Sequence, residues 1–421
     1  MKLKAFSEAK LLSDVGFRER LDCLNEKDRL SHHIHRYPAK MIYHIPYFFL
    51  HDDQFCSKED IVLDSFCGSG TVLVESVLAN RECIGADLNP LCCLITKVKT
   101  TPLDKREIDN ATKKLLKKLE TKANLCNTVF PNVDYWFTRN AQKSLAWIKW
   151  SIEECEFDHS LKDFFLVCFS SIIRESSRAD PRIGPPVLSK EMRTAIGEGR
   201  RTYPEKLFRE AVRKNRDRIL EFSSRCPTDA CAHVLFQDAK YLSLKDDSVD
   251  FVITSPPYMN AQKYFRSTRL ELFWLGLASE KRFACLDSYA IGTERIKTSE
   301  YPHLRKTGIH EVDEKLEKIF EDNPSRASEV AKYFVDLDHA VKEISRILET
   351  GKLFVLIVGD NKVRGMRFPS HDIVVKIAEE WGFSLSGMVN DKIKSHGLMT
   401  KRNKTSGLID SEWILVFRKE W

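Results

Sequence analysis

The sequence predicts an α/β fold in which a mostly parallel sheet is interrupted by one large helical insertion. Two observations predict it. Short apolar segments bounded by turn residues, the pattern of buried strands, occur before residue 102 and again after residue 226. Between them, apolar residues recur mainly at helical spacing. We therefore divide the chain into residues 1–102, an insertion at 103–226, and residues 227–421.

The elements follow in order along the chain. DIVLDSFCGSGTVLVESVLAN predicts a short buried strand, a glycine-containing turn and a helix, and ECIGADLNP predicts a second strand that ends in an acid. Strand signals return after the insertion at HVLFQDA and VDFVITSPPY. Helices are expected near 333–348 and 371–381, with strands at KLFVLIVGD and EWILVFRK. Residues 278–326 are charged and irregular, and we expect a lid-like stretch there.

The composition indicates an intracellular globular protein. The 421 residues are 43% apolar and 30% charged, and no segment approaches the roughly 18 apolar residues that span a membrane. The N-terminus lacks the apolar core of a signal peptide. The twelve cysteines show no paired zinc-ligand spacing. We expect reduced thiols, no membrane segment, no metal and a cytoplasmic location.

Positive charge is concentrated in one part of the insertion. The formal net charge is +6, and residues 174–218 contain 13 Lys or Arg against 7 Asp or Glu, a difference that equals the whole excess. Such a segment is either a solvated helix face or a surface that contacts phosphate. The candidates for DNA contact are Arg174, Arg178, Arg182, Arg200 and Arg201.

A glycine-containing turn and two acids predict a cofactor site. In open parallel sheets, ligands bind outside the carboxyl ends of the strands, where the sequence places Gly68 and Gly70. Asp87 ends the second strand, where a carboxylate suits a ribose diol, and Asp64 precedes the turn, where it could receive an ammonium group. The GSG turn is neither a dinucleotide fingerprint nor a P-loop. These residues together suit S-adenosylmethionine.

Other readings of the same residues stay open at this point. The two glycines could form a plain tight turn, and Asp87 could be a helix N-cap. Asp238 ends the third strand, where an acid could accept a hydrogen bond from the adenine amino group, or could simply close a turn.

The tetrapeptide Ser255-Pro256-Pro257-Tyr258 ends the fourth strand. Two prolines remove two backbone donors and fix two φ angles, and Pro256 holds Ser255 in extended geometry. The result is a stiff strand end that offers carbonyl oxygens, one hydroxyl and one aromatic face. Such a segment is suited to holding a flat, polar group.

The chain resembles the S-adenosylmethionine-dependent DNA amino-methyltransferases, which methylate the exocyclic amine of cytosine (N4) or adenine (N6). DSFCGSGT, GADLNP, TSPPY and the upstream HRYPAKM carry the resemblance, which covers about residues 31–419. It implies a Rossmann-like methyltransferase sheet, mostly parallel, with an antiparallel strand near the C-terminus. The cofactor-binding residues expected are Tyr37, Pro38, Ala39, Asp64, Phe66, Gly68, Gly70, Thr71, Asp87, Leu88, Asp238 and Ala239. The catalytic residues expected are Ser255, Pro256, Pro257 and Tyr258.

The resemblance also implies a mechanism. The Ser255 hydroxyl and the Pro256 carbonyl would hold the two protons of the target amine and localise its lone pair, while Tyr258 stacks on a base flipped out of the duplex. Direct displacement then needs neither a covalent enzyme intermediate nor a metal. Cys67 is expected to pack in the wall, because no Pro-Cys motif of a C5-cytosine enzyme follows a strand.

In the family, Ser at the first position of the tetrapeptide is typical of N4-cytosine enzymes. We therefore expect a site-specific enzyme acting on double-stranded DNA in a prokaryotic nucleoid, with a possible cognate restriction endonuclease. The insertion is the candidate target-recognition region. An N6-adenine enzyme, an RNA base-amine methyltransferase and an inactive nucleic-acid-binding subunit are the alternatives.

Overall fold

The computed structural model describes residues 30–37, 40–121, 130–227, 230–259, 263–296, 301, 303–393, 409 and 411–421. Its centre is a seven-stranded sheet with the strand order β3-β2-β1-β4-β5-β9-β8. The strands are β1 (Val62–Asp64), β2 (Cys83–Asp87), β3 (Ala232–Phe236), β4 (Val249–Thr254), β5 (Leu348–Val358), β8 (Phe383–Lys392) and β9 (Ser411–Lys419). A separate hairpin joins β6 (Asn361–Val363) to β7 (Met366–Phe368).

The strands β1 to β5 pair in parallel, whereas β9 runs antiparallel to β5 and to β8. The predicted sheet, mostly parallel with an antiparallel strand near the C-terminus, is therefore confirmed. The strand β8 and the β6–β7 hairpin were not predicted. The hairpin turns at Arg364 and Gly365, which both have positive φ angles.

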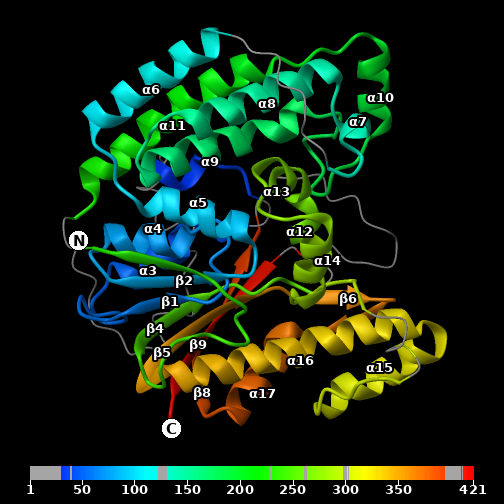
Figure 1. The fold of residues 1–421 in the computed structure, drawn as a ribbon. Helices are drawn as coiled ribbons and strands as arrows, with labels where there is room; N and C mark the ends of the chain where they lie inside the picture. Colours follow the sequence, from blue (N-terminus) through cyan, green and yellow to red (C-terminus); the bar gives the residue numbers. More distant parts are fainter. Residues whose placement is uncertain are drawn as a thin grey trace.

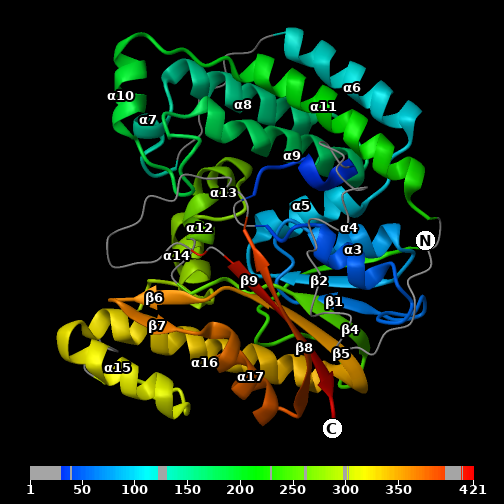
Figure 2. The ribbon, with the colours of Figure 1, turned by 180° about the vertical axis from the view of Figure 1, so that it is seen from behind.

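Helices cover both faces of the sheet (Figures 1 and 2). Alternate strand residues enter opposite cores, as the period of a strand requires: Val62 packs on the side of the insertion, and Leu63 packs on the side of α16. One face carries η2 (Leu30–His33), α3 (His44–Leu50), α4 (Thr71–Leu78) and α5 (Pro90–Thr100). The other carries α15 (His310–Asp322), α16 (Pro324–Ile347) and α17 (Ser370–Glu380).

The segment between α5 and β3 is helical and packs beyond α5 (Figure 1). Its described helices are α6 (Lys105–Glu120), α7 (Val133–Trp136), α8 (Arg139–Glu154), α9 (His159–Ser176), α10 (Lys190–Gly197) and α11 (Pro204–Arg225). Its apolar residues, such as Phe165 and Phe222, belong to the same hydrophobic cluster as Val62 of the sheet. The insertion thus shares its core with the α3–α5 layer.

The last group of helices lies beside the carboxyl ends of the parallel strands (Figure 1). It comprises α12 (Tyr264–Ser267), α13 (Arg269–Leu275) and α14 (Glu280–Tyr289). Residues 278–326 were expected to be irregular, but α14 and α15 lie within them, so that expectation is wrong for the described part. Within the described residues, no helix is both long and apolar enough to cross a membrane.

Candidate active site

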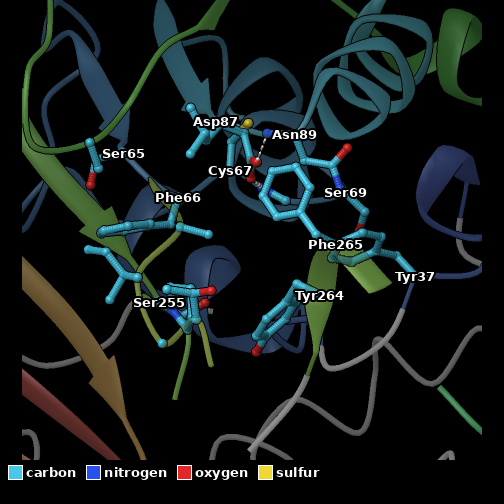
Figure 3. A pocket seen from close by; sticks show the side chains of 18 of the residues that line it. Tyr37, Ser65, Phe66, Cys67, Ser69, Asp87, Asn89, Ser255, Tyr264 and Phe265 are labelled. Atoms are coloured by element: carbon cyan, nitrogen blue, oxygen red, sulfur yellow. Dashed lines mark hydrogen bonds between the residues drawn. The ribbon is translucent and has the colours of Figure 1, made fainter. Parts of the chain in front are cut away.

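The parallel strands bring the predicted site residues to one edge of the sheet. The strand β1 ends at Asp64, β2 ends at Asp87, and β4 ends immediately before Ser255. Because parallel strands share a direction, these ends meet at the same edge. A cavity opens there, and Figure 3 shows Phe66, Ser255, Tyr264 and Phe265 around it.

Most of the predicted cofactor residues line this cavity. They are Tyr37, Asp64, Phe66, Gly68, Thr71, Asp87, Leu88, Asp238 and Ala239. Gly70 does not line the cavity but lies in the same turn. Pro38 and Ala39 lie outside the described residues.

The turn between β1 and α4 depends on two glycines with positive φ angles, +50° at Gly68 and +78° at Gly70. The Gly70 amide donates to the Cys67 carbonyl at 2.7 Å, which closes the turn. A Cβ at Gly70 would lie 2.8 Å from both Oγ1 and Cγ2 of Thr96, so no larger residue fits without a shift. The buried Lys99 donates from Nζ to the Ser69 carbonyl at 2.8 Å and ties the turn to α5.

Asp87 holds the turn and faces the cavity. Its Oδ2 accepts from the Gly68 amide at 2.9 Å, and its Oδ1 accepts from the Asn89 amide at 2.7 Å. Burial raises the pKa of this carboxyl to about 6 despite these hydrogen bonds. Because each carboxylate oxygen can accept more than one hydrogen bond, both remain able to accept from a ligand hydroxyl.

Asp64 is almost completely buried at the end of β1. Both of its hydrogen bonds end on Oδ1, from the Thr254 hydroxyl at 2.6 Å and from the Phe66 amide at 3.1 Å. Burial raises the pKa of the Asp64 carboxyl to about 7. A cation bound in the cavity would favour its ionised form.

Asp238, two residues beyond β3, lies at another part of the cavity wall. Its Oδ1 accepts from the Lys240 amide at 3.1 Å, and its Oδ2 is 3.3 Å from the ammonium group of Lys240. The buried Lys240 also lies 3.7 Å from Asp336 of α16. Asp238 is therefore held in place by its own turn and by a shared cation.

Two buried serines in the cavity wall lack a partner. The side chains of Ser65 and Ser69 are 1% and 3% exposed, and neither Oγ has a hydrogen-bond partner among the described residues. Buried hydroxyls without partners are costly and point to a polar group that is absent. The two serine hydroxyls, the carboxylates of the acids and the backbone amides of the glycine turn together provide hydrogen-bond donors and acceptors. This combination fits a cofactor that has an amino-acid end and a ribose.

Cys67 also lines the cavity and is buried. Burial raises the pKa of its thiol well above the ordinary value, so the thiol stays protonated at neutral pH. A protonated thiol is a poor nucleophile, which is consistent with the packing role predicted for Cys67.

The tetrapeptide begins in this cavity and turns away from it. Ser255 and Pro257 line the cavity, whereas Pro256 is buried. Tyr258 is only partly exposed, and its hydroxyl donates to Oε1 of Glu412 at 2.9 Å. The structure thus brings most of the predicted cofactor residues to one cavity with Ser255 and Pro257 of the tetrapeptide.

Sequence reasoning missed part of the cavity wall. Tyr264 and Phe265 of α12 line it, as do Asp287 and residues 289–294. The Tyr264 ring stacks toward that of Tyr37, with centroids 6.4 Å apart. The aromatic pair a few residues after the tetrapeptide was a usable signal, whereas residues 289–294 gave none.

The five predicted DNA-contacting arginines fall into two groups. Arg174 points inward: its Nη2 donates to the carbonyls of Gly184 at 2.5 Å and Ser267 at 2.7 Å. Arg178 donates to the carbonyls of residues 134 and 135, and Arg200 donates to those of residues 175 and 177. These three therefore hold the backbone of the insertion in place, and Arg174 also ties it to the end of α12.

Arg182 and Arg201 reach the surface. The Arg182 side chain is 51% exposed and pairs with Asp180 at 2.7 Å. Arg201 is exposed in the segment before α11. Of the five arginines, these two are exposed enough to contact the phosphates of a nucleic acid.

Comparison with known proteins agrees with this geometry. The model of a family described as DNA methylase, of N6 and N4 type, matches residues 18–98. The chain is 26% identical to the type II methyltransferase M.MvaI of Kocuria varians, over 92% of this chain and 91% of the relative. It is 24% identical to the type II methyltransferase M.BsoBI of Geobacillus stearothermophilus, over 86% and 79%.

The comparisons indicate a methyltransferase that uses S-adenosylmethionine, and the residues of the cavity fit that cofactor. These matches make the chain similar to the amino-methyltransferase family that contains the N4 and N6 enzymes. The predicted resemblance is thereby confirmed at the level of the family.

Among solved structures, a methyltransferase from Methanosarcina mazei has a TM-score of 0.31 at 10% identity, over 87% of this chain and 95% of that one. A TehB-like methyltransferase from Corynebacterium glutamicum has the same TM-score and identity, over 96% of both chains.

Proposed function

We propose that the chain is a site-specific DNA methyltransferase that transfers a methyl group from S-adenosylmethionine to the N4 amine of a cytosine turned out of the duplex. One observation carries the proposal: Ser255 opens on the same cavity as Asp64, Gly68 and Asp87. The reacting amine and the cofactor would therefore share one enclosed space. The full-length similarity to two type II methyltransferases supports DNA as the substrate and a role in a restriction-modification system.

The residues have separate tasks in this proposal. Asp87 accepts from the ribose hydroxyls, Asp64 faces the ammonium group, and Asp238 faces the adenine amine. Thr71 opens α4, whose first amides point toward the anionic end of the ligand. When bound, the cofactor supplies an electrophilic methyl group.

The tetrapeptide prepares the nucleophile. An exocyclic amine is a poor nucleophile because its lone pair is delocalised into the ring. The Ser255 hydroxyl and the Pro256 carbonyl accept hydrogen bonds from its two N–H groups, which localises the lone pair on nitrogen. The prolines keep both acceptors in place before the reaction. Ser255 and Pro256 would hold the amine while the bound cofactor supplies the methyl group: the new nitrogen–methyl bond would replace the sulfur–methyl bond, the thioether would be the leaving group, and the excess proton would pass to solvent.

Two features of the chain support the choice of base and the reading of the target. A Ser at position 255 is typical of N4-cytosine members of the family. The surface of the insertion includes the exposed Arg182 and Arg201 and the 62% exposed Tyr203, whose side chains are suited to phosphate and base contacts. We propose that this surface takes part in reading the target.

Mass analysis of nucleosides tests the function. Long heterogeneous DNA is incubated with the protein and S-adenosylmethionine and is then digested. We expect N4-methylcytosine, none from Ser255→Ala, and normal yield from Ser224→Ala, an exposed serine at the end of α11. N6-methyladenine would keep the chemistry and overturn the choice of base. No methylated nucleoside, with cofactor binding intact, would favour an RNA substrate or a binding-only subunit.

A further inference from the structure

The catalytic tetrapeptide is held from the opposite half of the sheet. The Tyr258 hydroxyl donates to Oε1 of Glu412 at 2.9 Å, across 154 residues of sequence. Glu412 is the second residue of β9 and does not line the cavity in which Ser255 lies. The hydrogen bond to Tyr258 is a contact that joins Glu412 to the site.

The reversed direction of β9 explains how a glutamate reaches this edge. In the β5–β9 ladder, Val358 pairs with Trp413. The start of β9 thus lies beside the end of β5, and the end of β5 is at the edge where β4 delivers Ser255. A parallel strand in this position would present its carboxyl end there, and Glu412 would lie at the far edge.

The Tyr258 ring is also fixed from the side. A Cβ at Gly359 would lie 3.1 Å from Cδ2 and 3.3 Å from Cε2 of Tyr258, so the ring rests against the backbone that follows β5. Asn361 donates from Nδ2 to the carbonyl of Met259, which holds the next residue of the segment. The ring is thus supported along one edge and tied at its hydroxyl, and both contacts restrict the orientation of its plane.

The hydroxyl can serve as a permanent donor. Burial, with a further contribution from the nearby Glu412 carboxylate, raises the pKa of Tyr258 well above its ordinary value. The phenol therefore stays protonated across the working range of pH. A hydrogen bond to an ionised acceptor is also stronger than one between neutral groups.

We propose that Glu412 is a positioning residue for methyl transfer, which fixes the Tyr258 ring in the plane against which the target base stacks. The proposal rests on the proposed function of the tetrapeptide. Glu412 touches neither the base nor the cofactor, so its loss lowers the turnover rate and leaves cofactor affinity unchanged. A glutamine keeps an acceptor oxygen at the same reach, so it restores part of the rate.

The test is a double-mutant cycle with four proteins: wild type, Glu412→Ala, Tyr258→Phe and the double variant. Methylation of long DNA gives kcat and KM, calorimetry gives the affinity for S-adenosylmethionine, and thermal melting reports folding. We expect Glu412→Ala and Tyr258→Phe each to lower kcat roughly tenfold, the effect of losing one hydrogen bond to a charged group. We expect the double variant to be no slower than Tyr258→Phe, and Glu412→Gln to be faster than Glu412→Ala but slower than wild type, because its acceptor is neutral.

The outcomes separate the two proposals. A wild-type protein that methylates no DNA overturns the proposed function and this inference with it. If the wild type is active and Glu412→Ala leaves kcat unchanged, the inference alone is overturned. It is also overturned if the fold-losses in kcat of Glu412→Ala and Tyr258→Phe multiply in the double variant. If Glu412→Ala does not fold, Tyr258→Phe removes the same hydrogen bond from the other side, and wild-type kcat in that variant refutes the idea. Glu380→Ala, an exposed glutamate at the end of α17, is the matched control.

Discussion

Replacing Gly70 by alanine tests how the cofactor turn is built. The φ angle of Gly70 is +78°, a conformation that costs an L-residue about 1–2 kcal/mol. The new Cβ would lie 2.8 Å from Thr96 Oγ1 and Cγ2 and 3.1 Å from Thr96 Cα, and overpacking of this kind costs about 1–3 kcal/mol. We expect Gly70→Ala to lower the free energy of unfolding by about 2–5 kcal/mol.

Gly365 provides a matched control. Its φ angle is +81°, almost that of Gly70, but a Cβ there meets nothing within 4 Å. Gly365→Ala should therefore lose only the conformational part, about 1–2 kcal/mol. The difference between the two variants measures the collision with Thr96.

Denaturant unfolding measures both losses, and calorimetry measures the affinity for S-adenosylmethionine. We expect only Gly70→Ala to weaken cofactor binding, because its turn positions the first amides of α4. Adding Thr96→Ala should recover part of the loss, since it removes the two nearest atoms and leaves Cα. Equal losses in Gly70→Ala and Gly365→Ala would refute the close-approach argument.

Three further predictions follow from single residues. Because burial raises the pKa of Asp64 to about 7, its ionised form increases as pH rises through that value; affinity for the cationic cofactor should rise with it, and Asp64→Asn should flatten that profile in calorimetry. Arg174→Ala should cost about 3 kcal/mol or more of unfolding free energy, because it strips donors from two partly buried carbonyls and leaves the buried Glu271 carboxylate without the guanidinium 3.9 Å away. Arg201→Ala should leave stability unchanged and weaken salt-dependent DNA binding; the reverse pattern would contradict both assignments. Gly359→Ala should press on Ile409, whose Cγ2 would lie 2.9 Å from the new Cβ, and on the Tyr258 ring, and should lower kcat with cofactor affinity intact; unchanged kinetics would show that both side chains have room to move.

The sequence was informative wherever chemistry is local to a strand end. A short apolar run precedes each of Asp64, Asp87 and Ser255. Because the carboxyl ends of parallel strands lie at the same edge of a sheet, these three residues are expected close together. The turn glycines could be read in the same way, because a positive φ angle leaves few alternatives to glycine. The central sheet and the helical insertion followed from periodicity alone.

Contacts made at long range could not be read from the sequence. The number of arginines in the insertion does not say whether a guanidinium meets a phosphate or a carbonyl, and Arg174, Arg178 and Arg200 meet carbonyls. In the sequence, Glu412 is an ordinary polar residue at the start of a strand. The antiparallel pairing of β9 with β5 brings it to the edge of the sheet where Tyr258 lies. The strand β8 was hidden because its alternation is weak and its pairing with β9 contains an irregularity between Leu385 and Gly387.

The connectivity of the insertion explains why the residues proposed to face DNA are hard to identify from sequence. The helix α5 starts at the catalytic edge after Asp87 and runs back, so the chain enters the insertion, and later enters β3, at the opposite edge (Figure 1). The insertion reaches the catalytic side only through long helices: α9, with 18 residues at 1.5 Å each, spans about 27 Å. Arg174 lies near its far end and binds carbonyls of the loop at Gly184 and of Ser267, which ends α12. The position of the insertion surface relative to the cavity thus depends on helix length and on the Arg174 guanidinium, besides the shared hydrophobic core, so a change in either should alter the proposed target reading without touching a residue proposed to contact DNA.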